Sequence, residues 1–345
     1  MTKTLLALAL LCASIGSAIA APAQPLLFVS NRGGNAQIHV MNADGSGEHA
    51  LTRGPAENTE PAWSPDGKRI VFTSYRDGNA EVYVMQADGS RATRLTVQDQ
   101  ADNAPAWLPD GRIVFRSLRS GWANFYAMQA DGTGVTPLTT GDGDKGPPVP
   151  SPDGRWLAFV AFSERGGSEI HLMPATGGKP RDLTSSLSKG GKSFPSWSPD
   201  SRRLAYVEAK SPAMNVQVVN ADGTQPAKLT DNAYTNAFPI WAPDGRRIAF
   251  VSSREGTRTE MARGDIYVMN ADGSSVVNLT RHPDEDNYPA WAADGSAIYF
   301  VSLRDGNAQL YAVPLNGDAP ARLTRNSGHD VGVRPLRLQP PTLTH

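Results

Sequence analysis

A motif that recurs every 43 to 50 residues constrains this chain of 345 residues more than any other feature. Its clearest copy is Pro-Ala-Trp-Ser-Pro-Asp-Gly at residues 61–67, and the gaps between successive copies are 44, 43, 47, 44 and 50 residues. The leading prolines are Pro61, Pro105, Pro148, Pro195, Pro239 and Pro289. A period of this length indicates an array of identical structural units, so the repeat determines the fold class.

Each copy of the repeat contains four short segments with the character of β-strands. In the clearest copy, the Pro-x-Trp segment is followed by an apolar β-branched run at residues 69–73 and an alternating segment at residues 81–85. A final short segment ends at Leu95-Thr96. Asp-Gly pairs separate the segments, and glycine tolerates the positive φ that tight hairpin turns require. Four antiparallel strands in each unit of about 40–45 residues predict an all-β fold, a β-propeller of WD40-like repeats.

The number of blades follows from counting the first and last segments separately. Leu-Thr ends seven units, whereas the Pro-x-Trp type of segment occurs six times. Residues 26–52 supply the last three segments of a blade without its first, and the tail at residues 335–340 aligns with residues 61–66. We therefore expect seven blades, with six as the alternative, and a first blade formed by residues 26–52 and 333–338. This C-terminal strand would close the ring and cover the exposed sheet edges.

Tryptophan follows the leading proline by two residues in five repeats. These residues are Trp63, Trp107, Trp197, Trp241 and Trp291. A ladder of aromatic rings that stacks on carbohydrate is one interpretation of this pattern. Because every ring lies on the same strand of its blade, packing between neighbouring sheets is the preferred interpretation.

The first 20 residues predict a cleaved signal peptide. Lys3 precedes an apolar run, and Ala18-Ile19-Ala20 forms a small-x-small cleavage site. Cys12 is the only cysteine, and bulky Leu11 before it disfavours the alternative of a lipid-attachment site. Residues 21–345 would then form a single propeller domain in the periplasm or outside the cell. With 33 Lys and Arg against 34 Asp and Glu, no charge excess favours nucleic acid, and no apolar run is long enough to span a membrane.

The repeat resembles a known family of envelope proteins. Residues 61–67, the Arg-Asp-Gly-Asn turn at residues 76–79 and residues 83–89 are similar to the propeller repeats of TolB, the periplasmic component of the Tol envelope system. The resemblance implies a propeller, and the same repeat occurs in envelope scaffolds, peptidase propellers and oligogalacturonide lyases. This chain departs from TolB in two features. TolB has an N-terminal α/β domain, for which the repeats leave no room here, and TolB has six blades, whereas seven are expected in this chain.

No set of residues in the sequence defines a catalytic or metal centre. The Gly-x-Ser-x-Gly string that an appended peptidase domain requires does not occur. His39 and His171 occupy the position where other repeats place tyrosine, which indicates packing. His282 and His329 lie in equivalent loops, and the lyase alternative requires that they converge near the channel. Calcium is an alternative at the acidic turns of residues 142–144 and 284–287, but neither matches a defined binding loop and a solvated turn is preferred.

The loops before each first strand predict a ligand-binding surface at one mouth of the central channel. They offer carboxylates, amides and aromatic rings, the usual composition of a recognition site. The candidates are Asn58, Glu60, Asp102, Asn103, Phe194, Asn236, Phe238, Asp286, Asn287, Tyr288, His329 and Asp330. We expect the repeated arginines of the second set of loops to pair with loop carboxylates of an adjacent blade. These arginines are Arg32, Arg76, Arg119, Arg254 and Arg304.

One loop is longer than its counterparts and is a second candidate for function. Thirteen positions separate Arg254 from Tyr267, whereas seven separate Arg76 from Tyr83. Added loop length on a rigid scaffold often carries function. The candidate residues in this insertion are Arg258, Glu260, Met261 and Arg263.

These patterns favour a non-enzymatic periplasmic scaffold that binds an envelope protein or peptide segment at the channel mouth. The expected protein is a monomer with no cofactor. The competing hypothesis, from a different functional class, is a carbohydrate-binding or oligosaccharide lyase propeller with a divalent metal at the same mouth. Fold-level resemblance alone does not decide between the two.

Overall fold

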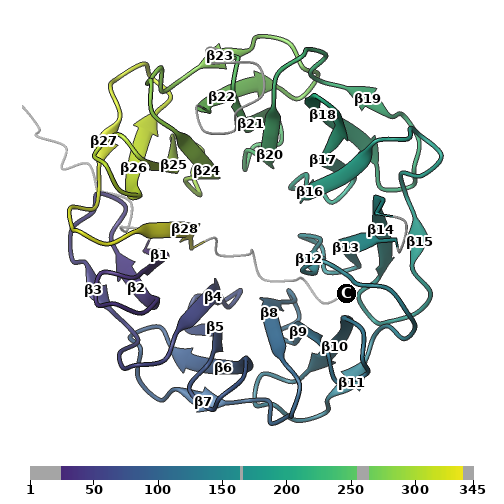
Figure 1. Ribbon diagram of the computed structural model, residues 1–345, viewed down its shortest axis with the longest axis vertical. Helices are drawn as coiled ribbons and strands as arrows, with labels where there is room; N and C mark the ends of the chain where they lie inside the picture. Colours follow the sequence, from purple (N-terminus) through teal and green to yellow (C-terminus); the bar gives the residue numbers. More distant parts are fainter. Residues whose placement is uncertain (1–24, 164–165, 255–263, 337–345) are drawn as a thin grey trace, which may run out of the picture.

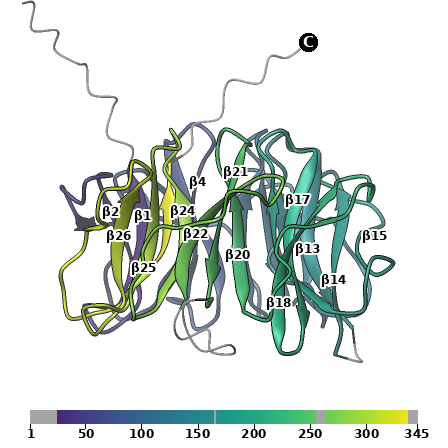
Figure 2. The ribbon, with the colours of Figure 1, turned by 90° about the horizontal axis from the view of Figure 1, so that it is seen from above.

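Seven four-stranded antiparallel sheets follow one another around a central channel in the computed structural model (Figures 1 and 2). The structure describes residues 25–163, 166–254 and 264–336, and those residues contain no helix. The first strand of each sheet lies along the channel, and the fourth lies at the rim of the ring (Figure 1). The expected all-β propeller with seven blades is therefore confirmed.

The blades are numbered along the chain. Blade 1 consists of β28 (Asp330–Pro335), β1 (Leu26–Ser30), β2 (Gln37–Met41) and β3 (His49–Ala50); blade 2 of β4 (Asn58–Trp63), β5 (Arg69–Ser74), β6 (Glu81–Gln86) and β7 (Thr93–Arg94). Blade 3 consists of β8 (Asp102–Trp107), β9 (Ile113–Ser117), β10 (Asn124–Met128) and β11 (Thr136–Pro137); blade 4 of β12 (Val149–Pro150), β13 (Trp156–Phe162), β14 (Ser168–Pro174) and β15 (Arg181–Asp182). Blade 5 consists of β16 (Gly191–Trp197), β17 (Arg203–Lys210), β18 (Ala213–Asn220) and β19 (Ala227–Lys228). Blade 6 consists of β20 (Asn236–Trp241), β21 (Arg247–Ser252), β22 (Asp265–Asn270) and β23 (Val277–Asn278); blade 7 of β24 (Asp286–Trp291), β25 (Ala297–Ser302), β26 (Gln309–Pro314) and β27 (Ala321–Arg322).

The repeated tryptophans pack between neighbouring blades. Four of them are buried, and Trp63 is half-buried. The indole N–H of Trp107 donates to the carbonyl of Ala62 in blade 2 at 3.2 Å, and that of Trp291 donates to the carbonyl of Ile240 in blade 6 at 3.1 Å. These contacts confirm the packing interpretation, because a buried ring cannot stack on a carbohydrate.

The Leu-Thr signature closes the outer edge of every blade. In all seven blades the threonine hydroxyl accepts a backbone N–H of the third strand, at 2.8 to 3.1 Å. The fourth strand has only two residues in each blade, so this side-chain bond adds to a short ladder. A buried N–H without a partner would destabilise the blade, which explains why threonine recurs at this position.

In blades 1, 2, 3, 5 and 6 the Ala-Asp-Gly turn packs against the leucine of the preceding blade. A Cβ atom at Gly89 would lie 2.9 Å from the carbonyl oxygen of Leu51, and one at Gly45 would lie 2.9 Å from that of Leu323. The second of these contacts joins blade 1 to blade 7. The glycines also have positive φ, 83° at Gly89, so the turn requires glycine for two separate reasons.

The ring closes through β28, which pairs with β1 in antiparallel register. Leu26 lies opposite Pro335, and Ser30 lies opposite Asp330. In blade 2 the equivalent partner of Pro335 is Trp63, so the alignment of Pro335 with Pro61 was wrong by two residues, and the closing strand begins at Asp330 rather than residue 333. Arg337 and Leu338 lie outside the described residues. Both ends of the described chain lie on the same face of the ring (Figure 2).

The predicted signal peptide at residues 1–20 also lies outside the described residues. Among those that the structure describes, no helix has the length and apolarity that crossing a membrane would require.

A substitution at Gly89 tests how far the ring depends on contact between blades. Gly89→Ala should destabilise the protein by about 2–4 kcal/mol, since the new methyl group would meet the backbone of Leu51 in a conformation unfavourable to alanine. Gly78→Ala is the matched control, because Gly78 has φ of 100° but no neighbour within 4 Å of its Cβ position. Urea unfolding of both variants measures the difference. Equal losses of stability would contradict a steric role for this contact.

Candidate functional site

Five blades contain the same buried arrangement around a repeated arginine. In blade 7, Arg304 donates from Nη2 to Asp286 at 2.9 Å and from Nε to Ser302 at 2.8 Å, and its guanidinium lies 4.7 Å from the centre of the Tyr311 ring. We call this arrangement the arginine unit. Its other copies join Arg32 to Asp330, Arg76 to Asn58, Arg119 to Asp102 and Arg254 to Asn236. The expected pairing with an adjacent blade was wrong, because each arginine pairs with the first strand of its own blade.

The arginine units remove most of the predicted polar residues from the channel surface. The partners of the five arginines are no more than 1% exposed. They are Asn58, Asp102, Asn236, Asp286 and Asp330. Burial raises the pKa of Asp102 and Asp286, although hydrogen bonds from serine and arginine favour the charged forms. These side chains therefore stabilise the blades and are not open to a ligand in this structure.

Blades 4 and 5 place lysine where the other blades have Asn or Asp. Lys145 lies opposite Ala161, and Lys192 lies opposite Glu208, as Asn58 lies opposite Ser74 in blade 2. Lys192 is fully buried, and its Nζ lies 3.6 Å from Glu169 and 3.9 Å from Glu208. No sequence motif marked this reversal of charge, because blades 4 and 5 lack the arginine that identifies the arginine unit.

The first strand of most blades contains a bulge, at its third residue or, in β16, at its fourth. The pairing shifts register at this point in six blades, between Ala237 and Ile240 in blade 6 for example. The residue at the bulge has positive φ, which is unusual for residues other than glycine. These residues are Glu60, Ala104, Phe194, Phe238 and Tyr288, with φ between 49° and 53°. In blade 1 the equivalent residue is Gly332, with φ of 68°.

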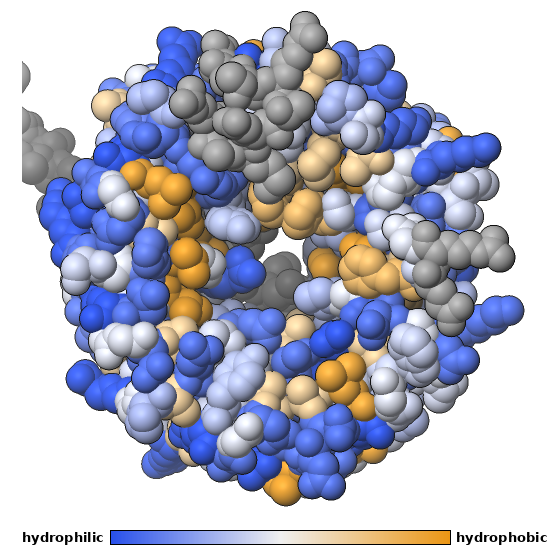
Figure 3. Space-filling view, viewed as in Figure 1, coloured by the Kyte–Doolittle hydropathy of each residue, from blue (hydrophilic) through white to orange (hydrophobic). Residues whose placement is uncertain are grey.

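Three of the bulge residues form a continuous aromatic surface, which we call the aromatic arc. The ring centres of Phe194 and Phe238 are 4.3 Å apart, and those of Phe238 and Tyr288 are 4.8 Å apart. The arc lines a cavity of about 830 Å³ together with Pro195 and Trp197. Phe194 is 38% exposed and Tyr288 is 50% exposed. Apolar surface borders the opening of the channel on this side of the ring (Figure 3).

The remaining candidates from the sequence are bound by their own neighbours. The Glu60 carboxylate accepts hydrogen bonds from Thr73 Oγ1 and from the backbone N–H of Ala104. Asn103 accepts a long bond from Arg116 at 3.4 Å, Asn287 donates to Glu285, and His329 Nδ1 accepts the N–H of Ala308 at 3.2 Å.

The insertion and the two acidic turns were the other candidates that the sequence offered. Arg258, Glu260, Met261 and Arg263 lie outside the described residues. Among the described residues no group of three or more His, Cys, Asp or Glu side chains is arranged to hold a metal ion, and this applies to both acidic turns that were considered for calcium. The described part of the candidate site is therefore the aromatic arc and its cavity.

Comparison with known families finds one match that covers the chain. The model of the TolB β-propeller domain matches residues 14–149, 148–259 and 194–334. No curated protein was found to match the sequence.

Solved structures share the fold at low sequence identity. TolB from Acinetobacter baumannii is 21% identical, with a TM-score of 0.56 over 76% of this chain, and the chain spans 65% of its length. An oligogalacturonate lyase from Vibrio parahaemolyticus is 16% identical, with a TM-score of 0.67 over 89% of this chain and 87% of the lyase. A puromycin-hydrolysing peptidase from Mycobacterium tuberculosis is 16% identical, with a TM-score of 0.68 over 85% of this chain and 50% of the peptidase. At these identities the likeness shows the fold alone.

Substitution of Asp286 tests the structural role of the arginine unit. Asp286→Ala should destabilise the protein by about 3–5 kcal/mol, because Arg304 would lose its buried carboxylate partner. Asp286→Asn should cost less, since Asn58 and Asn236 fill this position in blades 2 and 6. Denaturant unfolding compares the two variants. An Asn variant as unstable as the Ala variant would show that the amide does not replace the carboxylate.

His39 makes the first blade sensitive to acid. It packs 5.3 Å from Phe28, and burial, with the nearby Arg32, lowers its pKa from 6.5 to about 4. The unfolded chain therefore binds the proton more readily, and stability should fall by up to about 3 kcal/mol as the pH drops from about 6.5 toward 4. His39→Tyr, which introduces the residue of blades 2, 3, 6 and 7, should remove this part of the loss. Unfolding between pH 7 and 4 measures it, and parallel curves for the two proteins would contradict the assignment.

Proposed function

We propose a function from the premise that this chain belongs to the TolB β-propeller domain family. Its propeller serves as a non-enzymatic scaffold of the cell envelope, and it binds an extended segment of a partner protein in the cavity of the aromatic arc. The observation that carries this proposal is the contact of three partly exposed rings, Phe194, Phe238 and Tyr288, on one wall of the channel. The periplasm is the proposed location, after removal of residues 1–20.

The chemistry of the cavity favours a peptide over a carbohydrate. A carbohydrate site needs several polar side chains beside its aromatic platform, because each buried sugar hydroxyl requires a partner. The polar side chains of this cavity are those of Ser168, Lys192, Ser193, Ser196 and Arg334, and Lys192 is fully buried beside Glu169 and Glu208. Aromatic rings beside Pro195, Pro239 and Pro289 suit the apolar side chains of an extended peptide, for which ring faces supply a large contact area.

The competing assignment is an oligosaccharide lyase or sugar-binding propeller that uses a divalent metal. The fold likeness to the oligogalacturonate lyase of Vibrio parahaemolyticus motivates it. This assignment requires metal that remains bound through purification, and cleavage or binding of oligogalacturonides that a chelator abolishes. The scaffold requires neither.

Site-specific crosslinking in the cell envelope tests the proposed function. A photoreactive phenylalanine analogue replaces Tyr288, and a second protein carries it at Trp122, which is 38% exposed on a loop of blade 3. We expect one envelope protein to crosslink at residue 288 and not at residue 122. The added substitution Phe238→Ala should reduce the yield about tenfold, because the neighbouring ring contributes much of the contact area.

The outcomes separate the two assignments. Equal crosslinking from residues 122 and 288, or none from residue 288, would contradict a partner at the aromatic arc. Chelator-sensitive cleavage of oligogalacturonides by the purified protein would instead establish the lyase.

A further inference from the structure

The closing strand places a charged residue where the six other blades have an uncharged one. Arg334 of β28 lies opposite Leu27, as Ala62 of blade 2 lies opposite Val71. The equivalent residues of the remaining blades are Ala106, Val149, Ser196, Ile240 and Ala290. Arg334 is therefore a departure from the repeat, and six strands of the same ring form without an arginine at this position.

Arg334 shares a cavity with the aromatic arc. The cavity of about 830 Å³ is lined by Arg334 and by all three rings of the arc. Val149 and Ile240, two of the counterparts of Arg334, line it as well. A single bound segment that fills this cavity can thus contact the aromatic rings and the guanidinium together.

The guanidinium of Arg334 has no ion-pair partner among the residues that the structure describes. Within those residues its hydrogen bond is a long one, 3.4 Å from Nη1 to the carbonyl oxygen of Val333. The side chain is exposed to the channel but enclosed by the ring, and this burial lowers the pKa of Arg334, whereas the charge of Glu60 opposes the shift. The Glu60 carboxylate itself is held by Thr73 Oγ1 at 2.7 Å and by the backbone N–H of Ala104 at 2.8 Å.

No carboxylate lines the cavity of the aromatic arc in the described part of the chain. Its other cation, Lys192, is fully buried and lies 3.6 Å from Glu169 and 3.9 Å from Glu208. The positive charge of Arg334 therefore faces the apolar surface of the cavity without an anion. A charge between walls of low polarity attracts an opposite charge more strongly than it would in open water.

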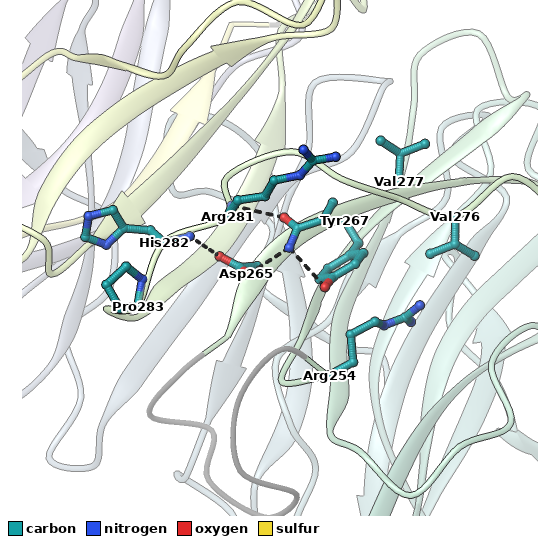
Figure 4. Close-up of a pocket in the computed structure, with 9 residues that line it drawn as sticks. Arg254, Asp265, Tyr267, Val276, Val277, Arg281, His282 and Pro283 are labelled. Atoms are coloured by element: carbon teal, nitrogen blue, oxygen red, sulfur yellow. Dashed lines mark hydrogen bonds between the residues drawn. The ribbon is translucent and has the colours of Figure 1, made fainter.

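A cavity on the outer part of blade 6 differs in this respect. Arg254 and Arg281 line it together with a carboxylate, that of Asp265. Asp265 accepts the backbone N–H of His282 at 2.9 Å (Figure 4). Among the lining residues that the structure describes, the outer cavity thus contains an acid and the channel cavity does not.

We propose that the segment bound at the aromatic arc carries an Asp or Glu side chain whose carboxylate pairs with Arg334, beside an apolar side chain that contacts the rings. A guanidinium presents paired N–H donors whose spacing matches the two oxygens of a carboxylate. This inference rests on the proposed function, because it specifies the peptide that the scaffold recognises. The partner segment is an extended acidic peptide, and a neutral or basic segment of the same shape binds less tightly.

An array of random heptapeptides, probed with the full chain, tests the proposal. Each peptide is acetylated at its N-terminus and attached through its C-terminus, so the side chains of Asp and Glu carry its only carboxylates. Pairs of peptides that differ only by Glu against Gln, or by Asp against Asn, are then titrated in solution. We expect the acidic member to bind about tenfold more tightly, because hydrogen bonds to a charged group are the strong ones. This advantage should shrink at high salt.

Three variants locate the contact. Arg334→Ala installs the residue of blades 2, 3 and 7, so the ring should fold, and the tenfold preference for acidic peptides should disappear. Arg334→Glu should reverse the preference in favour of peptides that contain lysine. Arg325→Ala is the matched control, because Arg325 is exposed after β27 and does not line the cavity, and it should leave the preference unchanged.

Phe238→Ala separates this inference from the proposed function. Blade 3 has Ala104 at the same bulge, so the variant should fold, and it should weaken acidic and neutral peptides alike. Peptides that depend on Phe238 but show no preference for an acid, or a preference that persists in Arg334→Ala, would overturn the carboxylate contact and leave the scaffold site. Absence of any peptide that binds saturably would overturn both.

Two further probes test the source of the carboxylate. A second array presents free C-termini on peptides with neutral side chains, and binding there that equals the acidic peptides and depends on Arg334 would overturn the side-chain assignment. Trigalacturonate is the other probe, because the oligogalacturonate lyase shares the fold. Binding of trigalacturonate that Arg334→Ala abolishes, without binding of acidic peptides, would assign the arginine to a sugar acid and overturn the peptide. Weak binding of both probes is the expected result.

Discussion

The backbone ladder between β1 and β28 joins the two ends of the described chain, and each blade depends on it for a neighbour on both sides. Leu26 pairs with Pro335, and Arg32 of the same blade binds Asp330, across 298 positions of sequence. An open array would leave one apolar sheet face at each end in water, and the ring removes both faces. The contact of Gly45 with Leu323 then joins blades 1 and 7 in the same way as Gly89 and Leu51 join blades 2 and 1.

Within this ring, the first strand of a blade carries a buried stabilising residue and, shortly after it, a residue that is free to contact a ligand. Its first residue is buried in the arginine unit, as Asp286 is, and fixes the strand to its own blade. Its third residue lies at the bulge, outside the regular ladder, as Tyr288 does. Because that side chain is not required by the pairing, it can differ from blade to blade at little cost to the fold. Aromatic rings occupy the bulge in blades 5, 6 and 7, whereas blade 3 has Ala104.

The sequence repeat predicted the parts of the structure that recur in every blade. It failed where the direction of a side chain or the register of a strand had to be known. Four segments in each unit and seven Leu-Thr endings were sufficient for the blade count and the closing strand. Asp102 was assigned to the channel surface because a polar residue near a loop suggests exposure, but Arg119 and Ser117 hold it in the interior. The buried Lys192 had no motif to mark it. The tail lacked the tryptophan that would have fixed its alignment, so its register was wrong by two residues.

Departures from the repeat are more informative about function in this fold than the repeat itself. The repeated side chains fill the spaces within and between blades, as the indole of Trp291 does between blades 6 and 7. At the channel, by contrast, the three aromatic bulge residues add apolar surface to a wall that carries Glu60 in blade 2. The rest of the strand ladder is unchanged by these differences, which explains how a ring built for closure carries a surface that varies from blade to blade.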